Sequence, residues 1–243
     1  MSFLIRDKWR CRHMVRAALF LVVLAVTSRA VAGGSPMRIV LAGDSTVTTN
    51  GGWGVGFAKA LRPGVECVNL ARGGQSSKSF RDSGQWQKVL DQKPTYILIQ
   101  FGHNDMPGKG PNRETDPATT YRENMARYVD EARAIGARPI LVTSMTRRYF
   151  KEGKINSNLL PYVDAVKNVA AEKKAPLLDL HARSIELFEQ LGPEGCRELS
   201  PNDPKTGKVD ATHLNRKGGE VVGKLVAREL KKAVPALADY FEP

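Results

Sequence analysis

Cysteine, histidine and long apolar runs are scarce in this chain of 243 residues, which holds three cysteines and four histidines. The apolar run at residues 17–26 is well short of the roughly 20 residues that a membrane-spanning helix needs. No spacing of cysteine and histidine resembles a zinc site. We therefore expect no metal or organic cofactor and no stable association with a membrane.

The N-terminal region has the three-part order of a secretory signal peptide. Residues 1–16 carry five basic side chains against Asp7, the apolar run follows, and Ala30-Val31-Ala32 ends the segment. This order predicts a signal peptide at residues 1–32, cleaved after Ala32, and a secreted or periplasmic protein. A membrane anchor is the alternative, and Arg29 is an unusual residue so close to a cleavage site.

The net charge of the chain is +12, and much of it belongs to this leader. Residues 1–32 hold six basic residues and one acidic residue, so the rest of the chain carries +7. Its lysines and arginines are scattered through predicted helices, whereas a nucleic-acid site gathers them among aromatic residues. We therefore expect no nucleic-acid partner.

Two cysteines remain beyond the leader, Cys67 and Cys196. An even pair in an oxidising compartment permits a disulfide. Cys67 lies within an apolar strand pattern, where a buried free thiol is equally compatible with the sequence. The sequence leaves both alternatives open.

Short apolar runs alternate with amphipathic helical stretches along residues 33–243, which we expect to form a single domain. The predicted strands are residues 37–42, 66–70, 96–101, 138–143 and 175–180. The predicted helices are residues 54–61, 85–90, 119–135, 159–173, 181–191 and 218–234, and the main polar loops are 106–117 and 192–209. Continuous apolar strands separated by helices predict an α/β fold, a three-layer α/β/α sandwich around a five-stranded parallel sheet.

In such sheets ligands bind outside the carboxyl ends of the strands, and Ser45 follows the first predicted strand. Its hydroxyl could act as a nucleophile, and its backbone N–H could donate to an oxyanion. The triplet Gly43-Asp44-Ser45 is weak evidence alone, because Asp and Ser are common turn residues. The G-x-S-x-G turn of α/β-hydrolases is absent, since Val47 occupies its last position.

The second and third strands are followed by possible oxyanion donors. Gly73 and Gly74 follow the second strand, where a glycine pair leaves N–H groups free to donate or simply forms a tight turn. Asn104 follows the third strand, and its side-chain amide could donate to the same oxyanion or cap the loop.

A candidate base lies near the C-terminus, where Asp210 precedes His213 by three residues. This spacing lets the carboxylate reach the imidazole and fix its tautomer. His103 and His181 are competing bases. His181 opens a helix after the fifth strand, as a packing residue would, and His103 has only Asp105 as a neighbouring acid.

Taken together, these blocks resemble those of the SGNH (GDSL-type) hydrolase superfamily. The blocks are Gly43-Asp44-Ser45, Gly74, Gly102-His103-Asn104-Asp105 and Asp210-Ala211-Thr212-His213. The resemblance implies a flavodoxin-like SGNH hydrolase fold. It assigns Ser45 as nucleophile, Ser45 N–H, Gly74 N–H and the Asn104 side chain as oxyanion hole, His213 as base and Asp210 as its partner. Gln75 departs from the family pattern, in which arginine is frequent at that position.

Within the superfamily, the chain most resembles the rhamnogalacturonan acetylesterase branch, through residues 43–46, 74–80, 101–105 and 143–148. That resemblance implies a serine esterase that removes acetyl groups from a pectin-type or related polysaccharide or oligosaccharide. We expect a monomer with a shallow polar cleft between loops 106–117 and 192–209. Trp53, Arg113 and Arg147 are candidate contacts for the sugar.

Two other functions are compatible with the same blocks. A GDSL lipase or lysophospholipase would need an apolar acyl channel, and neither polar loop carries a hydrophobic stripe. A non-catalytic carbohydrate-binding module would have no need of the complete set Ser45, Gly74, Asn104, Asp210 and His213.

Overall fold

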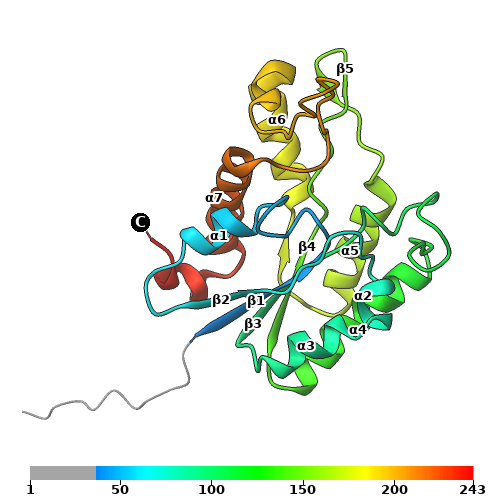
Figure 1. Ribbon diagram of the computed structural model, residues 1–243. Coiled ribbons are helices and arrows are strands. Elements are labelled where there is room, and N and C mark those ends of the chain that lie inside the picture. Colours follow the sequence, from blue (N-terminus) through cyan, green and yellow to red (C-terminus); the bar gives the residue numbers. More distant parts are fainter. Residues whose placement is uncertain (1–36, 243) are drawn as a thin grey trace, which may run out of the picture. The chain divides into compact units, whose positions relative to one another are not determined.

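The computed structural model describes residues 37–242, which lie within one compact unit (Figure 1). The signal peptide expected at residues 1–32 lies outside the described residues. Five parallel strands form the central sheet in the order β2-β1-β3-β4-β7. They are β1 (Arg38–Gly43), β2 (Glu66–Asn69), β3 (Tyr96–Gln100), β4 (Arg138–Val142) and β7 (Leu177–Leu178). This is the flavodoxin-like strand order, and the predicted fold class is confirmed.

Helices cover both faces of the sheet. They are α1 (Gly54–Lys59), α2 (Ser79–Asp82), α3 (Gln85–Asp91), α4 (Thr120–Ala134), α5 (Leu160–Glu172), α6 (Leu180–Arg197) and α7 (Arg216–Ala233), followed by the 3₁₀ helix η1 (Pro235–Tyr240). All six predicted helices are present, whereas the short α2 and η1 have no counterpart in the prediction.

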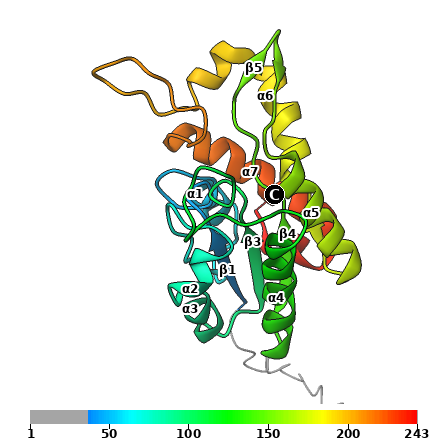
Figure 2. The ribbon, with the colours of Figure 1, turned by 90° about the vertical axis from the view of Figure 1, so that its right-hand side faces the viewer.

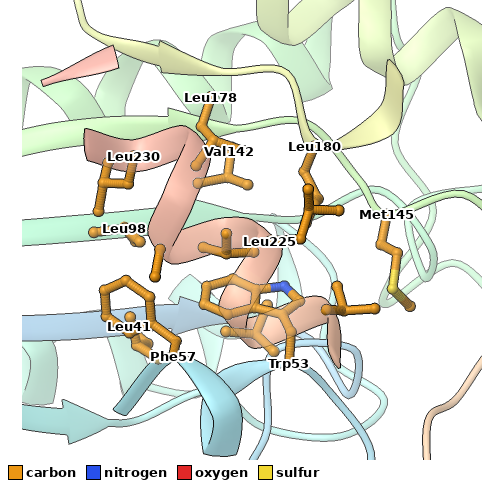
Figure 3. Close-up of a cluster of buried hydrophobic side chains, with 14 of the residues drawn as sticks. Leu41, Trp53, Phe57, Leu98, Val142, Met145, Leu178, Leu180, Leu225 and Leu230 are labelled. Carbon is orange, nitrogen blue, oxygen red and sulfur yellow. The ribbon is translucent and has the colours of Figure 1, made fainter. Parts of the chain in front are cut away.

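The alternation of side chains along β1 divides the core in two. Ile39 and Leu41 pack with residues of α1, α6 and α7 on one face, whereas Val40 and Ala42 pack with α3, α4 and α5 on the other. Figure 3 shows the first of these clusters, with Trp53 among leucines of the sheet and of α7. Both faces of the sheet are therefore buried beneath apolar side chains, as its continuous apolar strands require.

Helices α1 and α7 lie side by side on one face, and glycines form their contact (Figure 1). A Cβ added at Gly56 of α1 or at Gly223 of α7 would overlap main-chain atoms of the other helix. Helix α1 follows the segment of Ser45, and α7 follows His213. The two segments that carry these side chains are thus anchored on each other through a main-chain contact.

The structure departs from the sequence prediction at loop 192–209, whose first residues are helical. Gly192 has φ 66°, a left-handed conformation that ends the first part of α6, and Pro193 begins a further turn that runs to Arg197. The prediction of an irregular loop is wrong for these residues. From residue 198 to residue 209 the chain is irregular apart from one isolated bridge between Asn202 and Val209.

A hairpin of two short antiparallel strands, β5 (Phe150–Lys151) and β6 (Lys154–Ile155), was not predicted. Its turn contains Glu152 and Gly153, both at positive φ, as a tight hairpin requires. The side chain of Glu189 on α6 holds the hairpin by accepting from the backbone N–H of Ile155 at 3.0 Å.

Cys67 on β2 and Cys196 on α6 are both free thiols, so the structure favours the free-thiol alternative over the disulfide. Burial raises the pKa of the Cys67 thiol to about 12. Among residues 37–242, no helix combines the length and apolarity needed to cross a membrane. The same residues contain no group of three or more acidic, histidine or cysteine side chains arranged to hold a metal ion.

Candidate active site

The turn after β1 presents Ser45 at the carboxyl edge of the sheet. The buried Asp44 carboxylate holds this turn by accepting hydrogen bonds from the Thr46 N–H at 2.8 Å and the Thr46 hydroxyl at 2.7 Å. The Ser45 carbonyl accepts from the Thr48 N–H at 3.3 Å. Ser45 itself is half-buried.

A chain of hydrogen bonds joins Ser45 to His213 and Asp210. The Nε2 atom of His213 is 2.8 Å from Ser45 Oγ, and its Nδ1 atom is 2.7 Å from Asp210 Oδ2. The other carboxylate oxygen, Oδ1, accepts from the N–H groups of Thr212 at 2.7 Å and His213 at 3.0 Å. Partial burial opposes ionisation of Asp210, but the hydrogen bonds from His213 and Thr212 hold its pKa below the ordinary value. An ionised Asp210 favours the His213 tautomer whose Nε2 can accept a proton.

The segment that carries this pair is held from behind by Arg148, a buried residue that follows β4. Its guanidinium donates to the carbonyl of Asp210 at 2.9 Å and to the carbonyl of His213. The same side chain donates to Ser200 Oγ at 3.0 Å, and its backbone N–H donates to Ala211 O at 2.8 Å. The sequence places Arg148 in segment 143–148, which resembles the rhamnogalacturonan acetylesterase branch, but gives no sign of these contacts.

The structure brings the predicted oxyanion donors to the same edge of the sheet. Asn104 is half-buried, and its Nδ2 atom donates to the carbonyl of Gln75 at 3.0 Å, which ties the end of β3 to the loop that carries Gly74. Gly74 has φ 76°, and Gly73 lies closer to the nucleophile, since a Cβ at that position would be 3.8 Å from Ser45 Cβ. Within residues 37–242, the N–H groups of both glycines donate to no protein acceptor.

Of the three histidines that the structure describes, His213 alone contacts Ser45. His103 is buried, with its Nδ1 3.3 Å from Asp44 Oδ2. Complete burial opposes ionisation of Asp44, but His103 and the hydrogen bonds from Thr46 hold the pKa of that carboxyl below its ordinary value. His181 is buried with its Nδ1 2.9 Å from the carbonyl of Ser144, and burial lowers its pKa. Both competing bases are therefore buried, and neither is hydrogen-bonded to Ser45.

The expected sugar contact by Trp53 is wrong. The Trp53 side chain is fully buried, and its Nε1–H donates to Gln100 Oε1 at 2.9 Å. Arg147 is also buried, and its guanidinium donates to Thr212 Oγ1 at 2.8 Å and to the carbonyl of His103 at 3.3 Å. The role of Arg113, which is half-buried, stays a prediction.

Asp105, next to Asn104, joins its own loop to the segments that carry Ser77 and Thr115. Its buried carboxylate accepts from the Ser77 N–H at 3.0 Å, from the Ser77 hydroxyl at 2.5 Å and from the Thr115 hydroxyl at 2.9 Å. Burial raises the pKa of Asp105 to about 7, against the donors that favour its ionised form.

We expect Asp105→Asn to flatten the pH dependence of stability between pH 4 and pH 7. The folded pKa of about 7 lies above the ordinary 3.8, so the Asp105 contribution is fully present below pH 3.8 and is lost as pH rises towards 7. Relative to the variant, the wild type should lose on the order of 4 kcal/mol of unfolding free energy across this range. Denaturant unfolding of both proteins at several pH values measures the difference. Exposed Asp82→Asn is the control, and parallel curves for Asp105→Asn and wild type would contradict the prediction.

Most of the chain is similar to known proteins of one family. Residues 32–221 match the model of the GDSL-like Lipase/Acylhydrolase family. The rhamnogalacturonan acetylesterase RhgT of Bacillus subtilis is 38% identical over 223 residues, which cover 84% of this chain and 94% of that protein. The rhamnogalacturonan acetylesterase of Emericella nidulans is 28% identical over 83% of this chain and 87% of its own length.

Solved structures give the same picture of the fold. The crystal structure of protein YXIM from Bacillus subtilis superposes with a TM-score of 0.70 at 29% identity, covering 82% of this chain and 57% of that one. Axe2, an acetylxylan esterase from Geobacillus stearothermophilus, superposes with a TM-score of 0.60 at 19% identity, covering 82% of this chain and 94% of that one. At that identity the second likeness concerns the fold alone.

Proposed function

Because the chain belongs to the GDSL-like Lipase/Acylhydrolase family, we propose that it is a secreted serine esterase that removes acetyl groups from a carbohydrate. The chain is a carboxylic ester hydrolase by its family and its near relatives. The proposed substrate is an acetylated polysaccharide or oligosaccharide of the rhamnogalacturonan type, as the names of those relatives suggest. The observation that carries the proposed mechanism is the hydrogen-bonded chain from Asp210 through His213 to Ser45.

In the proposed reaction, His213 Nε2 takes the Ser45 hydroxyl proton while Ser45 Oγ attacks the acetyl carbonyl carbon. The N–H groups of Ser45 and Gly74 and the Asn104 amide stabilise the charge that develops on the carbonyl oxygen. His213 then protonates the departing sugar oxygen, which leaves acetyl-Ser45. Water, deprotonated by His213, attacks this ester and releases acetate, and Ser45 recovers its proton.

The cavity that adjoins Asp210 suits a polar ligand better than a long acyl chain. The cavity next to Asp210 is open and is lined mainly by polar residues of the segments 201–203 and 208–212. A long acyl chain would need an extended apolar channel, because its burial supplies most of its binding free energy. An acetyl group needs no such channel.

The proposal of secretion rests on the leader. The family match begins at residue 32, which is the last residue of the predicted signal peptide. A mature chain cut after Ala32 would retain the whole catalytic set, and we propose that it acts as a monomer. N-terminal sequencing of the exported protein and its mass in solution test these two points.

The proposed activity is tested by measuring acetate release from acetylated rhamnogalacturonan, acetylated xylan and p-nitrophenyl acetate, with p-nitrophenyl octanoate as the lipase-type substrate. We expect acetate release from the carbohydrates, and a kcat/KM for the acetyl ester at least about tenfold above that for the octanoyl ester. A preference for octanoate together with intact acetylated carbohydrates would instead support a lipase or lysophospholipase.

A further inference from the structure

We propose that Arg147 is a positioning residue that fixes the distance between the proposed base His213 and the proposed oxyanion donor Asn104. Its guanidinium binds the residue directly before each of them. Nη1 donates to Thr212 Oγ1 at 2.8 Å, and Nη2 donates to the carbonyl of His103 at 3.3 Å. This inference rests on the proposed function, since it gives Arg147 a part in the proposed reaction.

Three segments carry the proposed catalytic groups. They are the nucleophile segment 44–52, the oxyanion segment 102–106 and the base segment 210–214. Arg147 also contacts the oxyanion segment at Met106, whose Sδ is 3.7 Å from Nη2. In the part of the chain that the structure describes, no other side chain donates hydrogen bonds to both the oxyanion segment and the base segment. The contact between these two segments therefore depends on Arg147.

The nucleophile segment contacts each of the other two segments by itself. Asp44 Oδ2 is 3.3 Å from His103 Nδ1 in the oxyanion segment. The N–H of Leu214 in the base segment donates to the carbonyl of Gly51 at 2.9 Å. Arg147 thus supplies the third connection of a triangle. The third connection matters because the base and the oxyanion donors must act on the same ester at the same time, and small displacements of either are costly.

The main chain that carries Arg147 is itself anchored. Residues 143–148 are buried and run from the end of β4 to the β5–β6 hairpin, which Figure 2 shows extending away from the sheet. Within them, the Thr146 N–H donates to Ser184 Oγ at 3.0 Å. A guanidinium is planar and rigid, so it holds its two acceptors at a fixed separation. Arg147 can therefore transmit a fixed position from the sheet to both segments.

Arg147 is costly as a purely structural residue. Its side chain is buried, and among residues 37–242 it forms no ion pair with a carboxylate. A buried charge without an opposite charge opposes folding, and an apolar side chain of similar size would fill the same space at a lower cost. The geometry of its two acceptors, rather than stability, accounts for a guanidinium at this position.

Hydrolysis of two simple esters by Arg147→Met tests the inference. We expect kcat/KM to fall by about tenfold for p-nitrophenyl acetate and by about 100-fold for ethyl acetate, with KM for the first within about twofold of wild type. The two losses differ because p-nitrophenolate leaves without a proton, whereas ethoxide must take one from the base while the oxyanion is still held. Arg133→Met removes an exposed guanidinium that also donates to two main-chain carbonyls, and this control should keep wild-type rates.

Variants of Thr212 test the same bridge from its other end. Thr212→Val removes one acceptor and should lower kcat/KM for ethyl acetate by about tenfold, and Thr212→Ser should restore most of this loss. The double variant Arg147→Met/Thr212→Val should be no slower than Arg147→Met alone, because both changes break one bridge. Thermal unfolding checks each variant, and the Thr212 variants decide the question if Arg147→Met does not fold.

The inference is overturned if folded Arg147→Met loses equal factors on both esters, if its loss appears in KM, or if Thr212→Val hydrolyses ethyl acetate like wild type. Losses that multiply in the double variant would also overturn it. A failure of the proposed function has a different signature, because wild type would then release no acetate from any carbohydrate. The comparison of the two simple esters would still decide the role of Arg147.

Discussion

Ser45→Ala abolishes ester hydrolysis, with kcat lowered by about 10³-fold or more, while the fold is retained. The expected loss is large because the Ser45 hydroxyl is the group that would form the acyl-enzyme, and no other hydroxyl lies within hydrogen-bonding distance of His213 Nε2 in the described residues. The expected structural cost is small, since Oγ makes its one side-chain hydrogen bond to that nitrogen. The backbone N–H of residue 45 remains, so binding and oxyanion stabilisation should account for the residual rate.

The measurement is the rate of p-nitrophenyl acetate hydrolysis by purified wild type and variant, with thermal unfolding as the check on folding. Ser83→Ala, in an exposed turn, serves as the matched control and should keep full activity. A fluorophosphonate probe should label wild type and leave Ser45→Ala unlabelled. Hydrolysis by Ser45→Ala at the wild-type rate would refute the assigned nucleophile and with it the proposed mechanism.

Asp210→Asn is expected to lower kcat by on the order of 10⁴-fold at unchanged KM. Asparagine keeps an oxygen that can accept from the N–H groups of Thr212 and His213, so the turn should persist. Its amide nitrogen would face His213 Nδ1 and donate a hydrogen bond to it, where the carboxylate now accepts one. The imidazole would then carry its proton on Nε2, the atom that must take the proton of Ser45.

The measurement is the steady-state kcat and KM for p-nitrophenyl acetate. Thermal unfolding of the variant separates the tautomer effect from a general loss of structure. Asp203→Asn, an exposed acid of the preceding loop, is the control expected to keep wild-type kcat for p-nitrophenyl acetate. If Asp210→Asn retained kcat within about tenfold of wild type, Asp210 would be no more than a turn residue and another group would have to orient His213.

The features that the sequence could predict are those with a local signature. A buried parallel strand appears in the sequence as an apolar run. The first four predicted strands match β1 to β4 of the structure. The fifth, β7, spans two residues because Asp179 caps the helix that begins at Leu180. Ser45 and the Asp210–His213 pair have such signatures, since Ser45 lies beside a strand end and Asp210 lies three residues before His213, and the structure brings the three side chains together.

What could not be predicted depends on contacts between distant segments. Arg148 donates to the main-chain carbonyls of residues 210 and 213. Every residue type has such a carbonyl, so the sequence does not indicate this contact. The approach of Asp44 to His103 arises from the pairing of β1 with β3. The prediction that Trp53 contacts the sugar was wrong for a related reason. A tryptophan in a polar, glycine-rich segment suggests an exposed side chain, and only the packing of α1 and α7 shows that it is buried.

The glycine contact between α1 and α7 has a consequence for how this protein can change over evolutionary time. Any side chain at Gly56 or Gly223 would overlap main-chain atoms of the facing helix, so we expect both positions to require glycine. The hairpin β5–β6 and the segment 201–209 are bound by no such constraint. We therefore expect that a library of loop variants can alter substrate range while the distance between Ser45 and His213 stays unchanged.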